Sequence, residues 1–170
     1  MNKKTLFITQ AAAIAAIYVV LTHLANAFGL ANYAIQVRFS EALTVLPFFT
    51  PAAIPGLFVG CIISNITTGC MPLDTVFGSI ATLIGAFGTY AIGRFMRSNK
   101  ASKVLCTLPP ILANTIIVPF VLAYVYKFEG SIPYFMLTVG AGEIISCGIL
   151  GFILLLTFDR RKKELFDINE

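Results

Sequence analysis

The feature that most constrains the fold is the amount of uninterrupted apolar sequence. Five apolar stretches, at about 6–24, 39–69, 74–93, 104–126 and 132–158, occupy most of the 170 residues. A helix needs roughly 20 such residues to cross the hydrocarbon core of a bilayer. Only 12% of the residues are charged, about half the fraction in a soluble domain. We therefore expect an all-α integral membrane protein.

The basic residues indicate how often the chain crosses the membrane. The stretch 39–69 is long for one crossing and short for two, but ten of the twelve Lys and Arg fall in three clusters, at 3–4, 94–103 and 160–163. Basic loops stay in the cytosol, and two crossings within 39–69 place all three clusters there. We predict a six-transmembrane-helix bundle in the cell membrane, a single domain over 1–170 with both termini cytoplasmic. Its approximate helices are 6–24, 40–50, 54–68, 74–93, 104–126 and 132–158.

The segment that covers the second predicted helix and the start of the third contains three evenly spaced prolines, Pro47, Pro51 and Pro55. Proline removes a backbone donor and interrupts a helix. The segment therefore predicts two short helices joined by a tight cytoplasmic turn. Interrupted backbone is tolerated at membrane depth only where protein or a cavity covers it, so the helix at about 40–50 should lie inside the bundle.

Two polar residues lie deep in the last two predicted helices. Asn114 is ten residues into the fifth helix and Glu143 eleven into the sixth, so they reach a similar level from opposite sides. A carboxylate at that depth costs roughly 2.5–3.5 kcal/mol on insertion scales and is a candidate functional group. We favour a ligand contact for Glu143, with a structural hydrogen bond between helices as the alternative for each.

Further polar residues lie near the predicted outer ends of the helices. Arg38, Glu41, Asn65 and Asp74 are candidates for substrate binding. Three of these also have a structural alternative. Ser40 would be the N-cap of its helix with Glu41 in the first turn, and Arg38 would pair with Glu41 or reach the headgroups. Asp74 would cap the predicted helix at 74–93.

Aromatic residues, Phe77 and Tyr134 among them, surround this outer half. Each alone is typical of an interfacial belt, whereas together they offer stacking faces to a flat ring. A carboxylate also accepts two parallel N–H bonds from the edge of a guanine-type base. The residues therefore favour a planar, hydrogen-bonding heterocycle as the ligand.

Motifs for catalysis, phosphate binding or metal binding are absent from the sequence. No Walker A loop, GxSxG or HExxH occurs, and the four cysteines lack metal spacing. We expect no catalytic residue, no metal and no cofactor. Small residues at Ala11, Ala12, Ala15 and Ala16 have the spacing that lets helices approach closely in lipid; they predict a docking face for another membrane protein, or packing within the bundle.

The residues from 37 to 90 resemble a known family. "VRFSEALTVLPFFTPAAIPGLFVGCIISNI" at 37–66 and "DTVFGSIATLIGAFGTY" at 74–90 are similar to the QueT family of substrate-binding (S) subunits of energy-coupling factor (ECF) transporters. That family is assigned to the uptake of queuosine precursors, the 7-deazaguanine bases such as queuine.

The resemblance implies a binding subunit without catalysis of its own. An S subunit binds its solute with high affinity near the outer face and topples when it docks on a transmembrane coupling subunit of the EcfT type, which carries two cytosolic ATPases. The alanine pattern Ala11, Ala12, Ala15 and Ala16 matches the docking pattern of such subunits. Alternatives are an S subunit for a different vitamin or nucleobase, a structural membrane subunit, and a small membrane enzyme that uses Glu143 and Asp74.

Overall fold

The computed structural model describes residues 2–30, 37–96, 99 and 101–160, and helices are the only regular elements in these ranges. In chain order they are α1 (Lys3–Ala27), η1 (Phe39–Phe48), α2 (Ala53–Thr67), α3 (Pro72–Phe95), α4 (Ser102–Leu105), α5 (Leu108–Tyr124), α6 (Ile132–Glu143), η2 (Ile144–Leu150) and α7 (Gly151–Arg160). Here η1 is a 3₁₀-helix and η2 a single π-helical segment. Because α6, η2 and α7 follow one another without a break, they form one rod of 29 residues.

Among the residues that the structure describes, four helical stretches are long and apolar enough to cross a membrane: Lys3–Ala27, Pro72–Phe95, Ser102–Tyr124 and Ile132–Arg160. Two shorter apolar helices, η1 and α2, accompany them. This composition confirms the predicted all-helical membrane protein.

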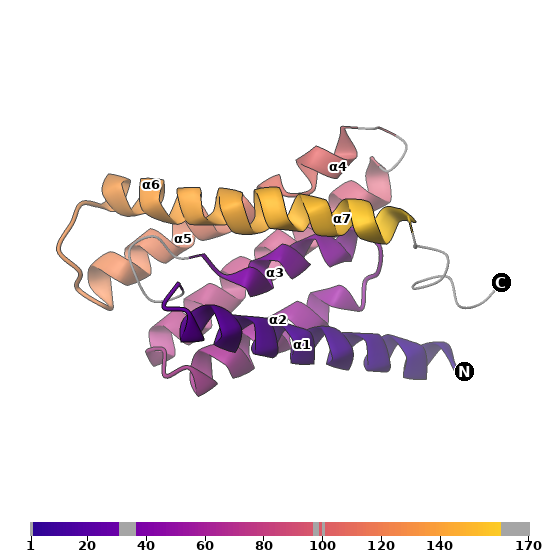
Figure 1. Ribbon diagram of the computed structural model, residues 1–170, viewed down its shortest axis with the longest axis horizontal. Helices are drawn as coiled ribbons and strands as arrows, with labels where there is room; N and C mark the ends of the chain where they lie inside the picture. Colours follow the sequence, from indigo (N-terminus) through magenta and orange to yellow (C-terminus); the bar gives the residue numbers. More distant parts are fainter. Residues whose placement is uncertain (1, 31–36, 97–98, 100, 161–170) are drawn as a thin grey trace.

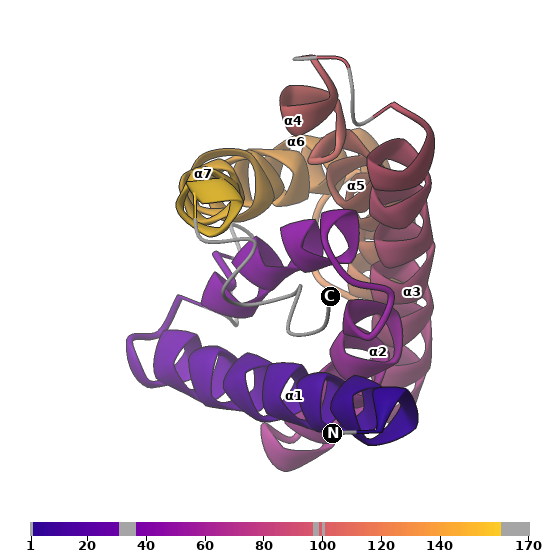
Figure 2. The same cartoon turned by 90° about the vertical axis from the view of Figure 1, so that its right-hand side faces the viewer.

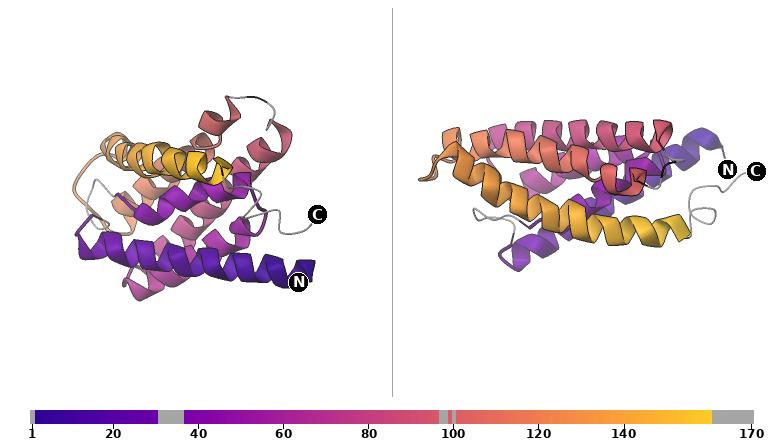
Figure 3. Two further views of the ribbon diagram at one scale, coloured as in Figure 1. Left: turned by 45° about the vertical axis from the view of Figure 1, so that its right-hand side comes forward. Right: turned by 90° about the horizontal axis from the view of Figure 1, so that it is seen from above.

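The helices form a bundle with η1 at its centre. Figure 2, which looks along the bundle, shows α1 on one side, α2 and α3 on a second and the α6–η2–α7 rod on a third. Because η1 contacts α1, α3, η2 and α7, it is enclosed by protein. In the right-hand view of Figure 3 the rod begins beside α5 and diverges from it toward α7, which leaves room for η1. The start of α1 and the end of α7 lie at the same end of the bundle (Figure 1).

The centre of the bundle accommodates η1 because η1 is short and most of its residues are apolar. Every residue from Ser40 to Phe48 is buried, which confirms that the helix predicted at about 40–50 lies inside the bundle. Pro47 falls within the helix and has no N–H for an ordinary α-helical bond. A 3₁₀-helix rises about 2.0 Å per residue, against 1.5 Å in an α-helix, so the ten residues reach farther than an α-helix of equal length.

Glycines let α1 and α2 pack with their backbones almost in contact. A Cβ added at Gly56 would lie 2.7 Å from the carbonyl oxygen of Ala11. One added at Gly60 would lie 2.9 Å from Cβ of Tyr18 and 3.1 Å from Cα of Ala15. Small residues four apart on both helices therefore fix the position of α1, and with it the position of Tyr18.

Replacing Gly60 by Ala should destabilise the protein, because the new methyl group meets backbone atoms that cannot move aside. Overpacking of this kind costs about 1–3 kcal/mol, so we expect a clearly lower midpoint of thermal unfolding in detergent. Gly148→Ala is the matched control, because its Cβ would meet nothing nearer than 3.7 Å. Equal midpoints for the two variants would contradict this account of the α1–α2 contact.

Candidate functional site

A cluster of buried polar side chains lies among the helices, in the half of the bundle away from the start of α1. Asn65 near the end of α2 and Asp74 in the first turn of α3 mark that end (Figure 1). The cluster draws on six parts of the chain: Tyr18 from α1, Glu41 and Thr44 from η1, Cys61 and Asn65 from α2, Asp74 from α3, Asn114 from α5, and Glu143, Ser146 and Cys147 from the continuous α6–η2 helix.

Glu41 is the polar group at the centre of this cluster, and only 2% of it is exposed. One of its carboxylate oxygens accepts a hydrogen bond from the hydroxyl of Tyr18. The other oxygen accepts from Nδ2 of Asn114, at 3.5 Å. A buried carboxylate needs such donors because burial removes its hydration. Glu41 therefore links α1, η1 and α5.

Glu143 ends α6 at the point where the π-helical segment begins. Its Oε2 accepts a hydrogen bond from Sγ of Cys147, at 3.1 Å. The same sulfur lies 3.4 Å from the carbonyl oxygen of Glu41 and 3.4 Å from Oγ1 of Thr44. Single π-turns within α-helices occur frequently at functional sites, and this one carries both Glu143 and Cys147.

The carboxylates of Glu41 and Glu143 face each other. One oxygen of each, together with Sγ of Cys147, lies within 4.8 Å of the other two atoms. Three such donor atoms are also a set that could hold a metal ion. Two negative charges at this separation repel strongly where the dielectric constant is low. The arrangement therefore suits a ligand that donates hydrogen bonds or carries positive charge.

A second set of polar groups lies at the outer edge of the cluster. Oδ2 of Asp74 accepts a hydrogen bond from the hydroxyl of Tyr126, at 2.8 Å. A Cβ added at Gly78 would lie 3.3 Å from Nδ2 of Asn65 and 3.7 Å from Oδ1 of Asp74. Gly78 therefore packs closely against both the amide of Asn65 and the carboxylate of Asp74.

The structure brings most of the predicted binding residues together. Glu41, Asn114 and Glu143 lie at the centre of the cluster. Arg38, Asn65 and Asp74 border it. Phe77 and Tyr134 lie elsewhere: they are 44% and 50% exposed, and Phe77 lines an apolar groove between α3 and α5 instead.

Glu41 lies in the first turn of η1, as one structural alternative stated, but three other parts of these alternatives are wrong. The N-cap of η1 is Arg38, and Oγ of Ser40 is hydrogen bonded to Oγ1 of Thr22 at 2.8 Å. The N-cap of α3 is Met71, which leaves Asp74 free to accept from Tyr126. Arg38 and Glu41 form no ion pair within 4.0 Å in the part of the chain that is described.

Five members of the cluster were missed by the sequence analysis: Tyr18, Thr44, Cys61, Ser146 and Cys147. Tyr18 lies in an alanine-rich helix whose buried side the sequence pattern does not reveal. Cys147 was considered only as a cysteine without metal spacing, although it follows Glu143 by four positions and therefore shares its helix face. That spacing was the available signal.

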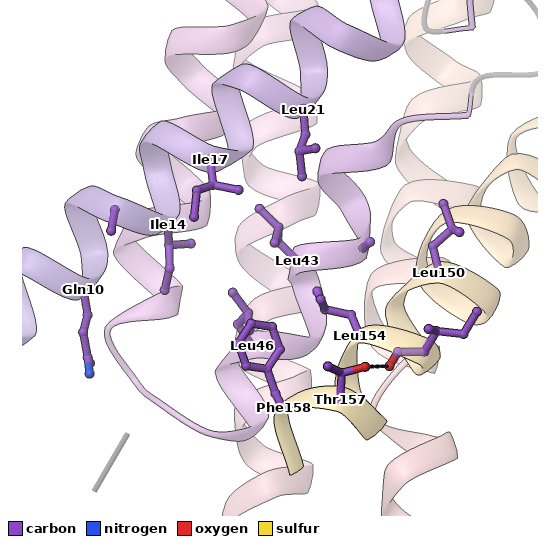
Figure 4. A pocket seen from close by; sticks show the side chains of 13 residues that line it. Gln10, Ile14, Ile17, Leu21, Leu43, Leu46, Leu150, Leu154, Thr157 and Phe158 are labelled. Carbon is purple, nitrogen blue, oxygen red and sulfur yellow. Dashed lines mark hydrogen bonds between the residues drawn. The ribbon is translucent and has the colours of Figure 1, made fainter. Parts of the chain in front are cut away.

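A separate apolar groove opens between α1, η1 and α7 (Figure 4). It has a volume of about 550 Å³, and Ile14, Leu43 and Leu154 point into it from the three elements (Figure 4). The polar groups at its rim include Gln10 and Thr157. With its apolar walls and without a charged lining residue, this groove cannot recognise a polar ligand as the buried cluster can.

Comparison with known proteins identifies the family. The family model described as QueT transporter matches residues 8–160. The queuosine precursor transporter QueT of Lactococcus lactis subsp. cremoris (strain MG1363) is 28% identical over 160 residues, which cover 90% of this chain and 92% of the relative. No solved structure matches the chain. The match to the family model spans most of the sequence, and the chain therefore belongs to the QueT transporter family.

Proposed function

We propose that this protein is the high-affinity substrate-binding subunit of an ECF-type importer for queuosine precursors, the 7-deazaguanine bases. The observation that carries the proposal is the buried group of Glu41, Asn114 and Glu143, contributed by three different elements. Family membership and the name of the Lactococcus relative support the substrate class.

The buried cluster has the chemistry that a deazaguanine requires. Carboxylate oxygens accept the N–H groups of such a base, and a side-chain amide both donates and accepts. Because the groups are buried, an analogue that lacks the matching donors would leave a carboxylate unpaired, which makes recognition selective. Binding needs no catalytic residue, so ATP hydrolysis belongs to partner ATPases.

We propose six crossings in one membrane domain, with η1 and α2 as the second and third. In this arrangement the start of α1 and the end of α7 are cytoplasmic. The positive-inside tendency supports it, because Lys3, Lys103 and Arg160 lie at one end of the bundle while Asp74 lies at the other (Figure 1). The ion pair between Lys103 and Asp159, at 2.6 Å, joins α4 to α7 at the proposed cytoplasmic end.

We also propose that α1 docks on the transmembrane coupling subunit through Ala12 and Ala16. The overlapping pair, Ala11 and Ala15, already packs against Gly56 and Gly60 of α2. Ala12 and Ala16 are exposed, so another helix can approach α1 closely at these two positions. The apolar groove of Figure 4 adjoins this face, because Ala13 and Ile17 line it. Toppling of the whole bundle on the partner would then carry the buried ligand toward the cytosol.

The substrate is tested by calorimetric titration of the purified protein with 7-deazaguanine bases, guanine, riboflavin and biotin. We expect binding of the deazaguanines alone. Glu143→Ala should weaken it by about 100-fold or more, because a charge-assisted hydrogen bond is lost and ligand donors stay unpaired.

Glu129→Ala is the matched control, since this acid is exposed in a loop, and it should bind as the wild type does. Binding of a different vitamin would replace the proposed substrate. Failure to bind any of these compounds would favour a structural subunit.

The docking face is tested by replacing Ala12 and Ala16 with Leu. Bulky side chains should keep the partner helix at a distance, so we expect little coupling subunit or ATPase to co-purify and uptake to be lost, with substrate affinity unchanged. Ala141→Leu, at an exposed alanine of α6, should leave co-purification intact. Normal co-purification of the double variant would contradict the assignment of this face.

A further inference from the structure

The charges in the buried cluster do not balance. Three carboxylates are buried in the described part of the chain, those of Glu41, Asp74 and Glu143, with exposed fractions of 2%, 5% and 6%. The cation that acts on them is Arg38. With all four groups ionised, three negative charges and one positive charge leave a net charge of −2.

Two of the three carboxylates, those of Glu41 and Glu143, lie together. The hydrogen-bond donors to this pair are neutral: the phenol of Tyr18, the amide of Asn114 and the thiol of Cys147. Neutral donors reduce the cost of burying a carboxylate but do not cancel its charge. The pair therefore gains most from a ligand that brings a positive charge.

The geometry of the pair fits an ammonium group. The nearest oxygens of Glu41 and Glu143 are no more than 4.8 Å apart, and an ammonium nitrogen at about 2.8 Å from each oxygen fits between them. A second observation comes from the same π-turn. Ser146 lies between Glu143 and Cys147 on the π-turn, is fully buried, and its Oγ has no hydrogen-bond partner among the described residues.

The outer set of polar groups then binds the opposite end of the ligand. In a 7-substituted deazaguanine, the substituent and the N–H edge of the base lie on opposite sides of the ring system. One molecule therefore cannot place both on carboxylates that are within 4.8 Å of each other. Asp74 and Asn65, which both lie close to Gly78, provide the acceptors for the N–H edge.

We infer that the site selects cationic substrates: planar deazaguanine-type bases with an alkylammonium substituent, which lies between Glu41 and Glu143. Neutral analogues, including the nitrile, lack the charge that this pair requires. This inference rests on the proposed function, because it assumes that the cluster binds the transported base.

The test is calorimetric titration of the full-length protein with three ligands that share one ring: the 7-aminomethyl, 7-hydroxymethyl and 7-cyano deazaguanines. The hydroxymethyl compound is the neutral match in size for the aminomethyl compound. We expect the aminomethyl compound to bind at least about 100-fold more tightly than either neutral ligand, as paired buried charges can provide.

Isosteric variants show where the preference arises. Glu143→Gln and Glu41→Gln should each reduce the ratio of aminomethyl to hydroxymethyl affinity by about tenfold or more, mainly through weaker binding of the cation. Asp74→Asn should weaken all three ligands by a similar factor and keep the ratio. Unfolding midpoints identify any variant that fails to fold, and either glutamate variant alone suffices for the test.

The possible outcomes are distinct. Equal affinities for the charged and neutral ligands, or an unchanged ratio in both glutamate variants, would overturn the inference while leaving the proposed function in place. Failure of all three compounds to bind would overturn the proposed function and this inference with it.

Discussion

A carboxylate held away from both water and lipid is the constraint on which the rest of this structure depends. Glu41 lies on a helix that is buried on all sides, and burying such a group without donors costs several kcal/mol. The bundle meets that requirement with the hydroxyl of Tyr18 and the amide of Asn114. These partners belong to helices that are distant in the sequence, so satisfying one side chain fixes how α1, η1 and α5 pack together.

The backbone geometry also helps to enclose Glu41 within the bundle. A helix of ten residues can be enclosed by a small bundle only if its neighbours come close. Glycines make this possible on two sides: a Cβ added at Gly93 would lie 2.7 Å from the carbonyl oxygen of Phe48, and one added at Gly151 would lie 3.0 Å from Cγ1 of Val45. On the third side the π-turn places Glu143 and Cys147 against η1. Fold and candidate site therefore depend on the same contacts.

Those features that follow from composition and residue count were predictable from the sequence. Long apolar runs predicted a helical membrane protein, prolines predicted that η1 is inside, and the depths of Asn114 and Glu143 placed these two residues at one level. Features that depend on how each helix is rotated about its own axis were not predictable. Tyr18 could not be recognised because α1 is apolar on nearly every side, and Phe77 was assigned to the site although its side of α3 faces outward.

The π-turn after Glu143 was also beyond prediction, since its one extra residue per turn is stabilised by packing against η1 and not by a local motif. The two helix caps considered from the sequence, Ser40 and Asp74, were wrong for a related reason. Ser40 and Asp74 have the composition of capping residues, but both side chains form tertiary hydrogen bonds instead. In a chain with few polar groups, buried partners on other helices compete successfully with local capping.

The central claim is that the buried cluster around Glu41 and Glu143 is where this protein holds its substrate. The most direct test is an experimental structure of the protein with a bound 7-deazaguanine base. Our account predicts ligand density in contact with Glu41, Asn114 and Glu143, inside the bundle. Density confined to the apolar groove between α1 and α7, with the buried cluster unchanged, would contradict it.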